Sequence, residues 1–208
     1  MNYTQEQDRF SPNTQFSIFP PAIQHLLIIN GLVFIAQQTP YIGRFLMEYG
    51  ALWPVESGYF WPWQLVTYMF MHANFGHIFF NLFALWMFGQ SIERLWGTNR
   101  FTVYYFITGI GAAILHMIVS GAGAPTIGAS GAVYGILLAF GVMFPERPIL
   151  LIFFPVPIKA KYFVAIFGAL ELINGVTSVG GGIAYFAHLG GMLFGFILIR
   201  YWKYKGVV

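Results

Sequence analysis

The sequence predicts an all-α polytopic membrane protein, a bundle of six spanning helices. Only 8% of its 208 residues are charged, whereas 58% are hydrophobic. A soluble domain carries about 25% charged residues, so this chain has too few to cover a water-facing surface. Its apolar residues fall into runs close to the roughly 20 residues that a spanning helix needs. Gly, Pro and charged residues delimit six predicted spans: Ala22–Gln38, Gly76–Glu93, Arg100–Ser120, Ser130–Phe144, Lys161–Asn174 and Ile183–Trp202.

The segments outside these spans differ in composition. Residues 1–21 are polar and lack the pattern of a signal peptide, so we expect a cytoplasmic tail ahead of one membrane domain, residues 22–208. The long connection Thr39–Asn74 is rich in Trp and Tyr, which favour the membrane interface. It is either an ordinary aromatic belt or a lateral structural element. The short apolar segment Ile149–Val156 is either a re-entrant or interfacial piece or an early part of the fifth span.

The distribution of positive charge predicts how the chain is oriented in the membrane. Nine of the ten Lys and Arg residues lie on one side of the predicted spans, and only Arg44 lies on the other. Because Lys and Arg are retained on the cytoplasmic side, we expect both termini to be cytoplasmic. The uncharged connections Gly121–Ile127 and Gly175–Gly182 then face outward. We expect a multi-pass, monomeric protein of a bacterial inner membrane.

Composition also excludes several classes of function. The chain has no Cys, which excludes disulfides, thiolate metal sites and a cysteine nucleophile. Its net charge of +3 is not gathered into a basic segment, so we expect no nucleic-acid partner. His72 and His77 are spaced i, i+5 without an H-E-x-x-H motif, which argues against a zinc protease. We expect no metal and no cofactor.

Two stripes of small residues predict a close contact between the fourth and sixth spans. Membrane helices pack closely through small residues spaced four apart. Ser130 and His188 each stand next to one such stripe, toward the outer ends of their spans, so the packing would bring the two side chains together. Both would lie below the membrane surface, where polar groups need a water-filled cavity. The stripes are Gly131, Gly135 and Ala139 in the fourth span and Ala187, Gly191 and Gly195 in the sixth.

The chemistry of these residue types assigns roles to them. A serine hydroxyl becomes a good nucleophile when an adjacent base takes its proton, and His188 is the best-placed base. No Asp or Glu lies near His188 in sequence or at a matching predicted depth, which favours a dyad; Glu171 faces either the cavity or the outer surface. The Ser130 N–H begins a helix, where the dipole favours an anion. His77 and Asn81, on one helix face, could donate further hydrogen bonds to an oxyanion.

Plainer interpretations of the same residues remain alternatives. Ser130 could cap its helix, and His188 could be a packed interior histidine. His72 is expected to be interfacial or to line the cavity, and His25 and His116 to be structural or interfacial. The run Gly180–Gly182 is expected to be a flexible cap over the site rather than a phosphate-binding loop, because no Lys follows it and no strand precedes it.

Together these motifs resemble the rhomboid family of intramembrane serine proteases. The resemblance covers nearly all of the chain after the tail, and it includes an E-R-x-x-G motif after the second span. It implies that Ser130 is the nucleophile and His188 the base, and that His77, Asn81 and the Ser130 N–H form an oxyanion hole. It also implies that Tyr134 packs against the catalytic imidazole. The motifs are Gly128–Gly131 (G-x-S-G), Ala187–Gly191 (A-H-x-G-G), His72–Asn81 (H-x4-H-x3-N) and Glu93–Gly97.

We also expect supporting roles for Gly128, Gly131, Gly191 and His72. One departure from the family lies in the first long loop, where Trp63-Gln64 stands in place of the frequent Trp-Arg and removes a charged anchor.

Three classes of function compete. The leading hypothesis is an intramembrane endopeptidase, and the resemblance implies that it cleaves single-span membrane proteins near the outer ends of their helices. The second is a catalytically inactive relative that binds transmembrane clients, although such relatives usually lack the serine or the histidine, and this chain has both. The third is a small transporter, which would show buried charges near the membrane midplane and repeated halves, and neither is evident.

Overall fold

The computed structural model describes residues 18–120, 124–151, 154–177 and 183–208 of the chain. Six long helices in these ranges follow the six predicted spans to within a few residues, so the predicted all-α membrane fold is correct. By length and composition α4, α5 and α7 could each cross a membrane, and α6 is apolar but shorter. The six are α1 (Pro21–Gln37), α4 (Phe75–Trp96), α5 (Thr98–Ser120), α6 (Ser130–Met143), α7 (Ala160–Thr177) and α8 (Ile183–Tyr204).

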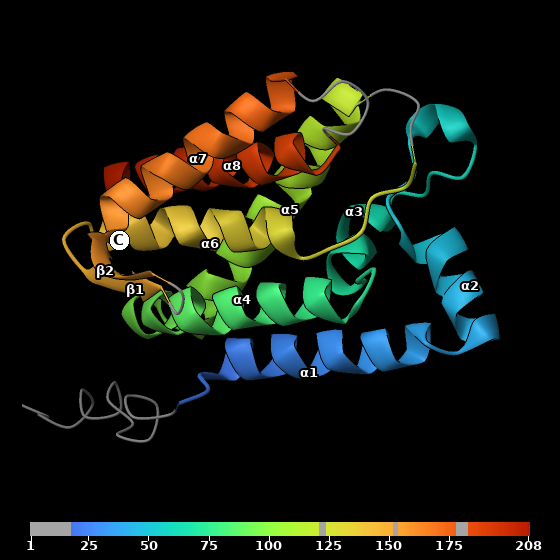
Figure 1. Ribbon diagram of the computed structural model, residues 1–208, viewed down its shortest axis with the longest axis horizontal. Coiled ribbons are helices and arrows are strands. Elements are labelled where there is room, and N and C mark those ends of the chain that lie inside the picture. The colour runs from blue at the N-terminus through green and yellow to red at the C-terminus, as the bar shows by residue number, and fades with distance from the viewer. Residues whose placement is uncertain (1–17, 121–123, 152–153, 178–182) are drawn as a thin grey trace, which may run out of the picture.

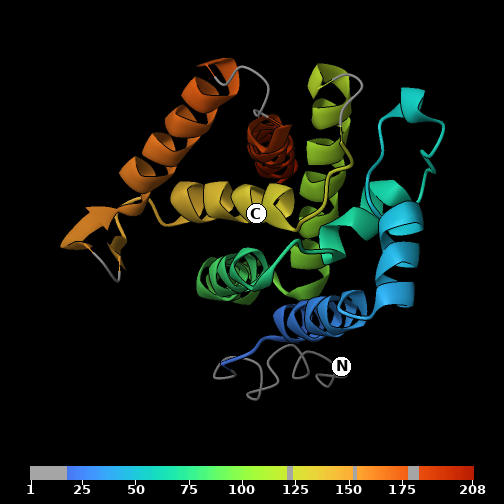
Figure 2. The same ribbon diagram turned by 45° about the vertical axis from the view of Figure 1, so that its right-hand side comes forward.

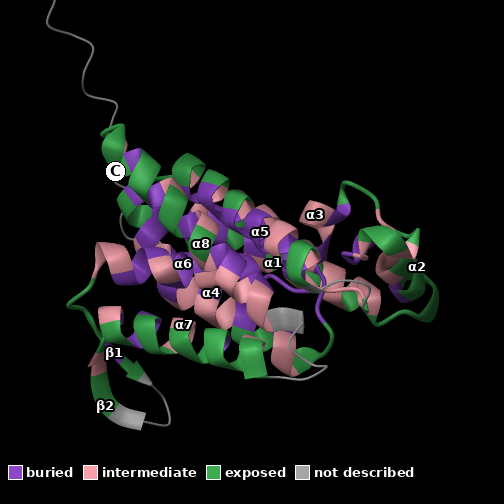
Figure 3. Ribbon diagram, turned by 90° about the horizontal axis from the view of Figure 1, so that it is seen from above, coloured by how far each residue is buried: buried purple, intermediate pink, exposed green. Residues whose placement is uncertain are grey.

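Helix α6 lies at the centre of the bundle (Figure 1, Figure 2). It contacts α4, α5, α7 and α8, and most of its residues are buried. Helix α7, by contrast, lies at the edge and is exposed along much of its length (Figure 3). On the outer helices large apolar side chains such as Leu32 and Ile118 are exposed, as expected for a surface that faces lipid. The first residue of α6 is therefore within reach of several surrounding helices.

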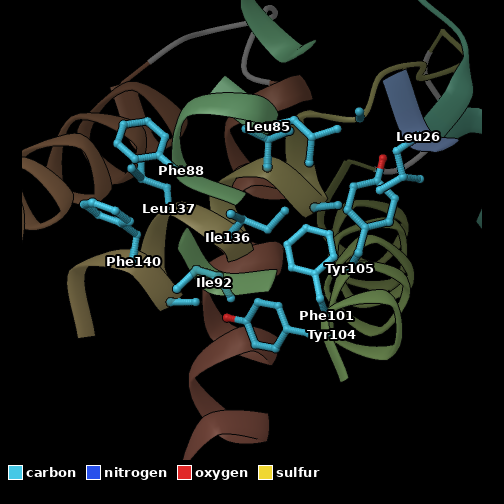
Figure 4. Packing of buried hydrophobic residues seen from close by; sticks show 14 of the residues in the cluster. Leu26, Leu85, Phe88, Ile92, Phe101, Tyr104, Tyr105, Ile136, Leu137 and Phe140 are labelled. Atoms are coloured by element: carbon cyan, nitrogen blue, oxygen red, sulfur yellow. The ribbon is translucent and has the colours of Figure 1, made fainter. Parts of the chain in front are cut away.

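Large apolar side chains fill the space between α1, α4, α5 and α6 (Figure 4). Leu85 and Ile92 of α4, Phe101 of α5 and Ile136 of α6 are fully buried in this cluster. Van der Waals packing of this kind is a main force that holds helices together in lipid. It fixes α4, α5 and α6 relative to one another.

A buried carboxylate joins the start of α1 to the end of α4. Both oxygens of Glu93 accept backbone N–H groups, one from Ala22 at 2.8 Å and one from Ile23 at 2.9 Å. Thr98 Oγ1 donates to the same carboxylate at 2.8 Å. The first N–H groups of a helix have no partner within it, so Glu93 satisfies two of them for α1.

The long connection after α1 is a structural element rather than a simple aromatic belt. Its first helix is bent by 119° from α1. The bend falls at Thr39-Pro40, where the extended backbone of Thr39 and the fixed φ of Pro40 end one helix and begin the next. The connection contains α2 (Pro40–Gly50), the 3₁₀ turn η1 (Val55–Ser57), α3 (Gln64–Thr67) and the 3₁₀ turn η2 (Tyr68–Phe70).

Gln64, which replaces the frequent Arg of the family that the sequence resembles, is fully buried in this connection. Its side-chain oxygen accepts the Trp53 N–H at 3.2 Å. Its amide nitrogen donates to the carbonyl oxygen of Tyr59 at 3.0 Å and to that of Tyr49 at 3.4 Å. A neutral amide with both ends paired can be buried without a large cost, so the loop keeps an anchor after losing the charge.

The apolar segment around Ile149–Val156 forms a β-hairpin and is not an early part of the fifth span. Strands β1 (Pro148–Leu151) and β2 (Phe154–Lys159) pair antiparallel, and α7 begins only at Ala160. Pro155 and Pro157 explain the difference, because proline removes a helical hydrogen bond but is tolerated in a two-stranded ribbon. At the base of the hairpin Glu146 pairs with Lys159 and Lys161.

Several expectations fall on residues outside the described ranges. These include most of the predicted tail, the Gly180–Gly182 cap and part of the connection Gly121–Ile127. The start of α1, the hairpin and the C-terminus lie at the same end of the bundle (Figure 1). The cytoplasmic placement of that end stays a prediction.

We expect Glu93→Ala to lower the free energy of unfolding by about 2–4 kcal/mol, because it leaves two buried N–H groups without a partner. Thermal unfolding in detergent micelles measures the change. Glu48→Ala is the control, since Glu48 is exposed on α2 and its loss should change stability by no more than about 0.5 kcal/mol. Equal effects of the two substitutions would contradict the assignment.

Candidate active site

Ser130 and His188 meet where α6 and α8 cross. The Oγ of Ser130 lies 2.8 Å from Nε2 of His188. At this crossing a Cβ atom on Gly191 would collide with the carbonyl oxygen of Gly131. The absence of a side chain at Gly191 therefore allows the two backbones to approach and the two polar side chains to touch.

Two further glycines of the stripes, Gly135 and Gly195, contact α5 instead. A Cβ atom on Gly135 would lie 2.6 Å from Cβ of Thr108, and one on Gly195 would lie 3.1 Å from Cζ of Tyr104. The Tyr104 hydroxyl donates to the Gly135 carbonyl at 2.8 Å. The predicted contact between the stripes thus holds at Gly131 and Gly191, and α5 occupies the space beyond.

Ser130 is the first residue of α6 and does not cap it. The cap position is Ala129, and no side chain makes a capping hydrogen bond there. The Ser130 hydroxyl points to His188 instead, so the interpretation of Ser130 as a simple helix cap is wrong. The Ser130 N–H is one of the first N–H groups of α6, which lack partners within the helix and favour an anion.

The connection that leads into Ser130 is held by backbone hydrogen bonds. Leu52 and Thr126 exchange two N–H···O bonds of 2.9 Å, and the Gly128 N–H donates to the Tyr68 carbonyl at 2.9 Å. Gly128 has φ +133°, a conformation that favours glycine. A Cβ atom there would lie 2.9 Å from the ring of His77. Gly128 is therefore required both by its backbone and by the imidazole beside it.

His77 and Asn81 present N–H donors to the same cavity as Ser130. Asn74 caps α4 by accepting the His77 N–H at 2.9 Å. The Ala73 N–H donates to His77 Nδ1 at 3.2 Å. Since Nδ1 is the acceptor, the proton of the neutral ring is on Nε2. The Asn81 amide donates one N–H to the His77 carbonyl at 2.9 Å and retains a second.

The imidazole of His188 is enclosed by Tyr134 and Glu171. The Tyr134 ring stacks on it with centroids 4.2 Å apart and planes 6° from parallel. Oε2 of Glu171 lies 3.0 Å from His188 Nδ1. That distance is one of an ion pair rather than a hydrogen bond, and neither Oε2 nor Nδ1 has a hydrogen-bond partner among the described residues, so each is available to the other. The Tyr134 hydroxyl donates to the other oxygen, Oε1.

The expectation that no carboxylate lies at the depth of His188 is therefore wrong. Glu171 is 8% exposed and faces the interior, which also decides between its two predicted placements. The spacing of residues within one span does not reveal which residues of another span lie beside it. A signal was nevertheless present, because an acidic residue within an apolar span is costly and is retained for a reason.

A cavity of about 450 Å³ adjoins these residues. It lies between α4, α6 and α7 and reaches α8 at His188. Most of its lining is aromatic or aliphatic, as at Phe83 and Leu137, and the described lining residues include no Lys, Arg, Asp or Glu. Polar groups gather at one end, around Ser130 and Asn81. The site is thus an apolar chamber with a small polar cluster.

The remaining histidines lie outside the cavity lining. His72 is buried, and its ring packs edge-on against the ring of His77 with centroids 5.0 Å apart. Nε2 of His116 lies 2.7 Å from Oγ1 of Thr126, in the connection before α6. His25 Nδ1 lies 2.6 Å from a carbonyl oxygen at the start of α1. His72 is thus placed behind His77 rather than in the cavity.

Gly128→Ala should slow the reaction of Ser130 with a fluorophosphonate by about 100-fold or more, because the new methyl group would displace His77. Gly58→Ala is the matched control, since Gly58 has φ +76° but nothing within 4 Å of the added Cβ atom. It carries similar backbone strain without the collision and should label within about 2-fold of wild type, as a surface substitution does. Similar losses in both variants would show that strain alone is responsible.

The chain is similar to known proteins over most of its length. The Rhomboid domain family matches residues 60–204. Rhomboid protein 1, mitochondrial, of Saccharomyces cerevisiae is 32% identical over 195 residues, 88% of this chain and 54% of that protein. Presenilin-associated rhomboid-like protein, mitochondrial, of Mus musculus is 30% identical over 184 residues, 85% of this chain and 47% of that protein. Rhomboid protease GluP of Bacillus subtilis is 30% identical over 139 residues, 64% of this chain and 25% of that protein.

The chain therefore spans about half the length of the two mitochondrial relatives and less of the bacterial one. The domain match covers more than half of the chain, and the yeast relative matches most of it. The chain belongs to the rhomboid family.

Proposed function

We propose that this chain is a serine endopeptidase that hydrolyses peptide bonds inside the membrane. The contact of 2.8 Å between Ser130 Oγ and His188 Nε2 carries the proposal. This contact lies at the start of a helix and at the polar end of an apolar cavity. One relative, Rhomboid protease GluP, is named as a protease, which supports hydrolysis at the level of the family.

In the proposed reaction His188 Nε2 takes the proton of the Ser130 hydroxyl while Oγ attacks the scissile carbonyl carbon. The imidazolium then gives this proton to the departing amine as the C–N bond breaks, which leaves an acyl-enzyme. A water molecule then adds to the acyl carbon as His188 takes one of its protons, and the imidazolium gives this proton to Ser130 Oγ as the acyl C–O bond breaks. The carboxylic acid product is released, and the site is regenerated.

The negative charge of the tetrahedral intermediate needs donors that are in place before the reaction. The Ser130 N–H, Nε2–H of His77 and the second N–H of Asn81 are the candidates. In a cavity with an apolar lining such donors act more strongly than in water, because water does not compete for the oxyanion. A substrate carbonyl at the polar end of the cavity would meet both the nucleophile and these groups.

The shape of the cavity suggests how a membrane substrate would approach. It separates α4 from α7, and the rings of Phe88 and Phe163, with centroids 6.1 Å apart, close its inner end. Helix α7 leans away from α6 beyond this contact (Figure 2). A transmembrane segment of a single-span protein could enter between α4 and α7 from the lipid. It must unwind locally, because a helix engages its carbonyl oxygens in hydrogen bonds.

Location, orientation and assembly belong to the same proposal. Two of the relatives are mitochondrial and one is bacterial, so they do not favour a bacterial inner membrane. That membrane, the cytoplasmic placement of both termini and the monomer are our expectations. The alternative of an inactive relative that binds transmembrane clients would leave the Ser130–His188 contact without a use. Covalent labelling of Ser130 and cleavage of a reporter separate the two functions.

Ser130→Ala and His188→Ala should each abolish labelling by a fluorophosphonate and cleavage of a transmembrane reporter, since one removes the nucleophile and the other its base. Labelling and cleavage are measured in detergent micelles, with thermal unfolding as the control for folding. Folded wild-type protein that neither labels nor cleaves would favour client binding instead.

Asn81→Ala should lower the rate of cleavage by about 10- to 1000-fold, as the loss of one oxyanion donor does elsewhere. The substitution also removes the bond to the His77 carbonyl, so thermal unfolding is measured beside the rate. An unchanged rate in a folded variant would remove Asn81 from the oxyanion hole.

A further inference from the structure

Glu171 is a carboxylate inside a membrane span, and two functional candidates are its partners. Its side chain is only 11% exposed. One oxygen accepts the Tyr134 hydroxyl, and the other lies 3.0 Å from His188 Nδ1. Burying a carboxylate in an apolar surrounding is costly unless partners stabilise the charge. Here a hydroxyl and an imidazole take that part, and the described residues that line the adjoining cavity include no Lys or Arg.

Three side chains contact the imidazole of His188, and two of them also contact each other. Ser130 lies against Nε2, Glu171 lies against Nδ1, and Tyr134 both stacks on the ring and holds the carboxylate. If Nε2 is to accept the Ser130 proton, the proton of the neutral ring must be on Nδ1, which faces Glu171. A carboxylate at that position favours the required tautomer and stabilises the imidazolium that forms during attack.

We propose that Glu171 is a positioning residue for His188, so that the unit is Ser130–His188–Glu171 with Tyr134 as the group that orients the carboxylate. The inference rests on the proposed function and deepens it. Glu171 would hold the ring and its tautomer without touching the substrate.

The other side chains near His188 come from the helices that pack around it. On α4, a protonated His77 would repel a positive charge on His188. The Ala73 N–H donates to Nδ1 of His77, however, and so keeps the His77 ring neutral. From α6 come Ser130 and Tyr134, and from α7 comes Glu171. Helix α5 presents Ala112 and Leu115 where it meets α8 at Gly190, and its titratable His116 is engaged by Thr126. Glu171 is thus the group able to carry a negative charge in this set.

The test is the rate of fluorophosphonate labelling as a function of pH in Glu171→Gln. The variant keeps the shape of the side chain and removes the charge. We expect labelling to slow by about 10- to 1000-fold. We also expect the acidic limb of the pH–rate profile to move to lower pH, between about pH 5 and 8, because the imidazolium loses its counter-charge. Tyr134→Phe keeps the stacked ring and should give a smaller change in the same direction.

Glu93→Gln is the matched control, since Glu93 is also buried and hydrogen-bonded but lies near the end of α4, far along the helix from His77. It should lower the unfolding temperature and leave the pH midpoint of labelling in place. A labelling rate of Glu171→Gln within about 2-fold of wild type at every pH would overturn the inference. So would a loss that is uniform in pH and accompanied by destabilisation like that of Glu93→Gln, since that pattern indicates a structural role.

The two proposals fail in different ways. Wild-type protein without Ser130-dependent labelling would overturn both. Active wild-type protein with an unmoved profile in Glu171→Gln would overturn only the role of Glu171. If Glu171→Gln does not fold, the Tyr134→Phe profile decides, and an unmoved acidic limb in that variant then counts against the inference.

Discussion

The close approach of the α6 and α8 backbones at Gly131 and Gly191 is the constraint on which the site depends. Apolar surface gains little by burial against another helix in lipid, so helices associate through tight packing and hydrogen bonds. Any side chain at Gly191 would collide with the Gly131 carbonyl and push the helices apart. The separation of 2.8 Å between Ser130 and His188 would then be lost. Tyr134, one turn along α6, stacks on the same imidazole for the same reason.

The sequence predicted the parts of this arrangement that depend on length, composition and spacing. Apolar runs, with the Gly, Pro and charged residues that delimit them, located six helices. Small residues next to Ser130 and His188 predicted the crossing of α6 and α8. The same spacing did not reveal that α5 would occupy the space beside Gly135, because a small residue favours any close neighbour. Nor could it place Glu171 against His188, since the rotation and depth of α7 relative to α8 are set by tertiary packing. Side chains on different helices meet only after such packing is known.

Two buried polar side chains, those of Glu93 and Gln64, join neighbouring elements. Glu93 takes up two N–H groups of α1, and Gln64 joins three points of the connection that follows it. In each case the polar atoms are distributed over backbone groups that would otherwise lie unpaired in an apolar surrounding. Gln64 also explains how the chain departs from the Trp-Arg pattern without losing its loop. The anchoring requirement is a set of hydrogen bonds, which a neutral amide can meet.

Glu171 differs from these anchors because it belongs to the helix that borders the cavity. Helix α7 is packed on α6 near its start, where Val164 would meet a Cβ atom on Gly141, but it is exposed at Leu172 and Val176 farther along. A substrate that enters between α4 and α7 would press on this part of α7, where Glu171 faces the interior. The same helix would then govern both access to Ser130 and the carboxylate that orients its base. Under the proposed function the arrangement of His188 would depend on whether a substrate helix occupies the cavity, and Ser130 would differ in reactivity between the empty and the occupied cavity.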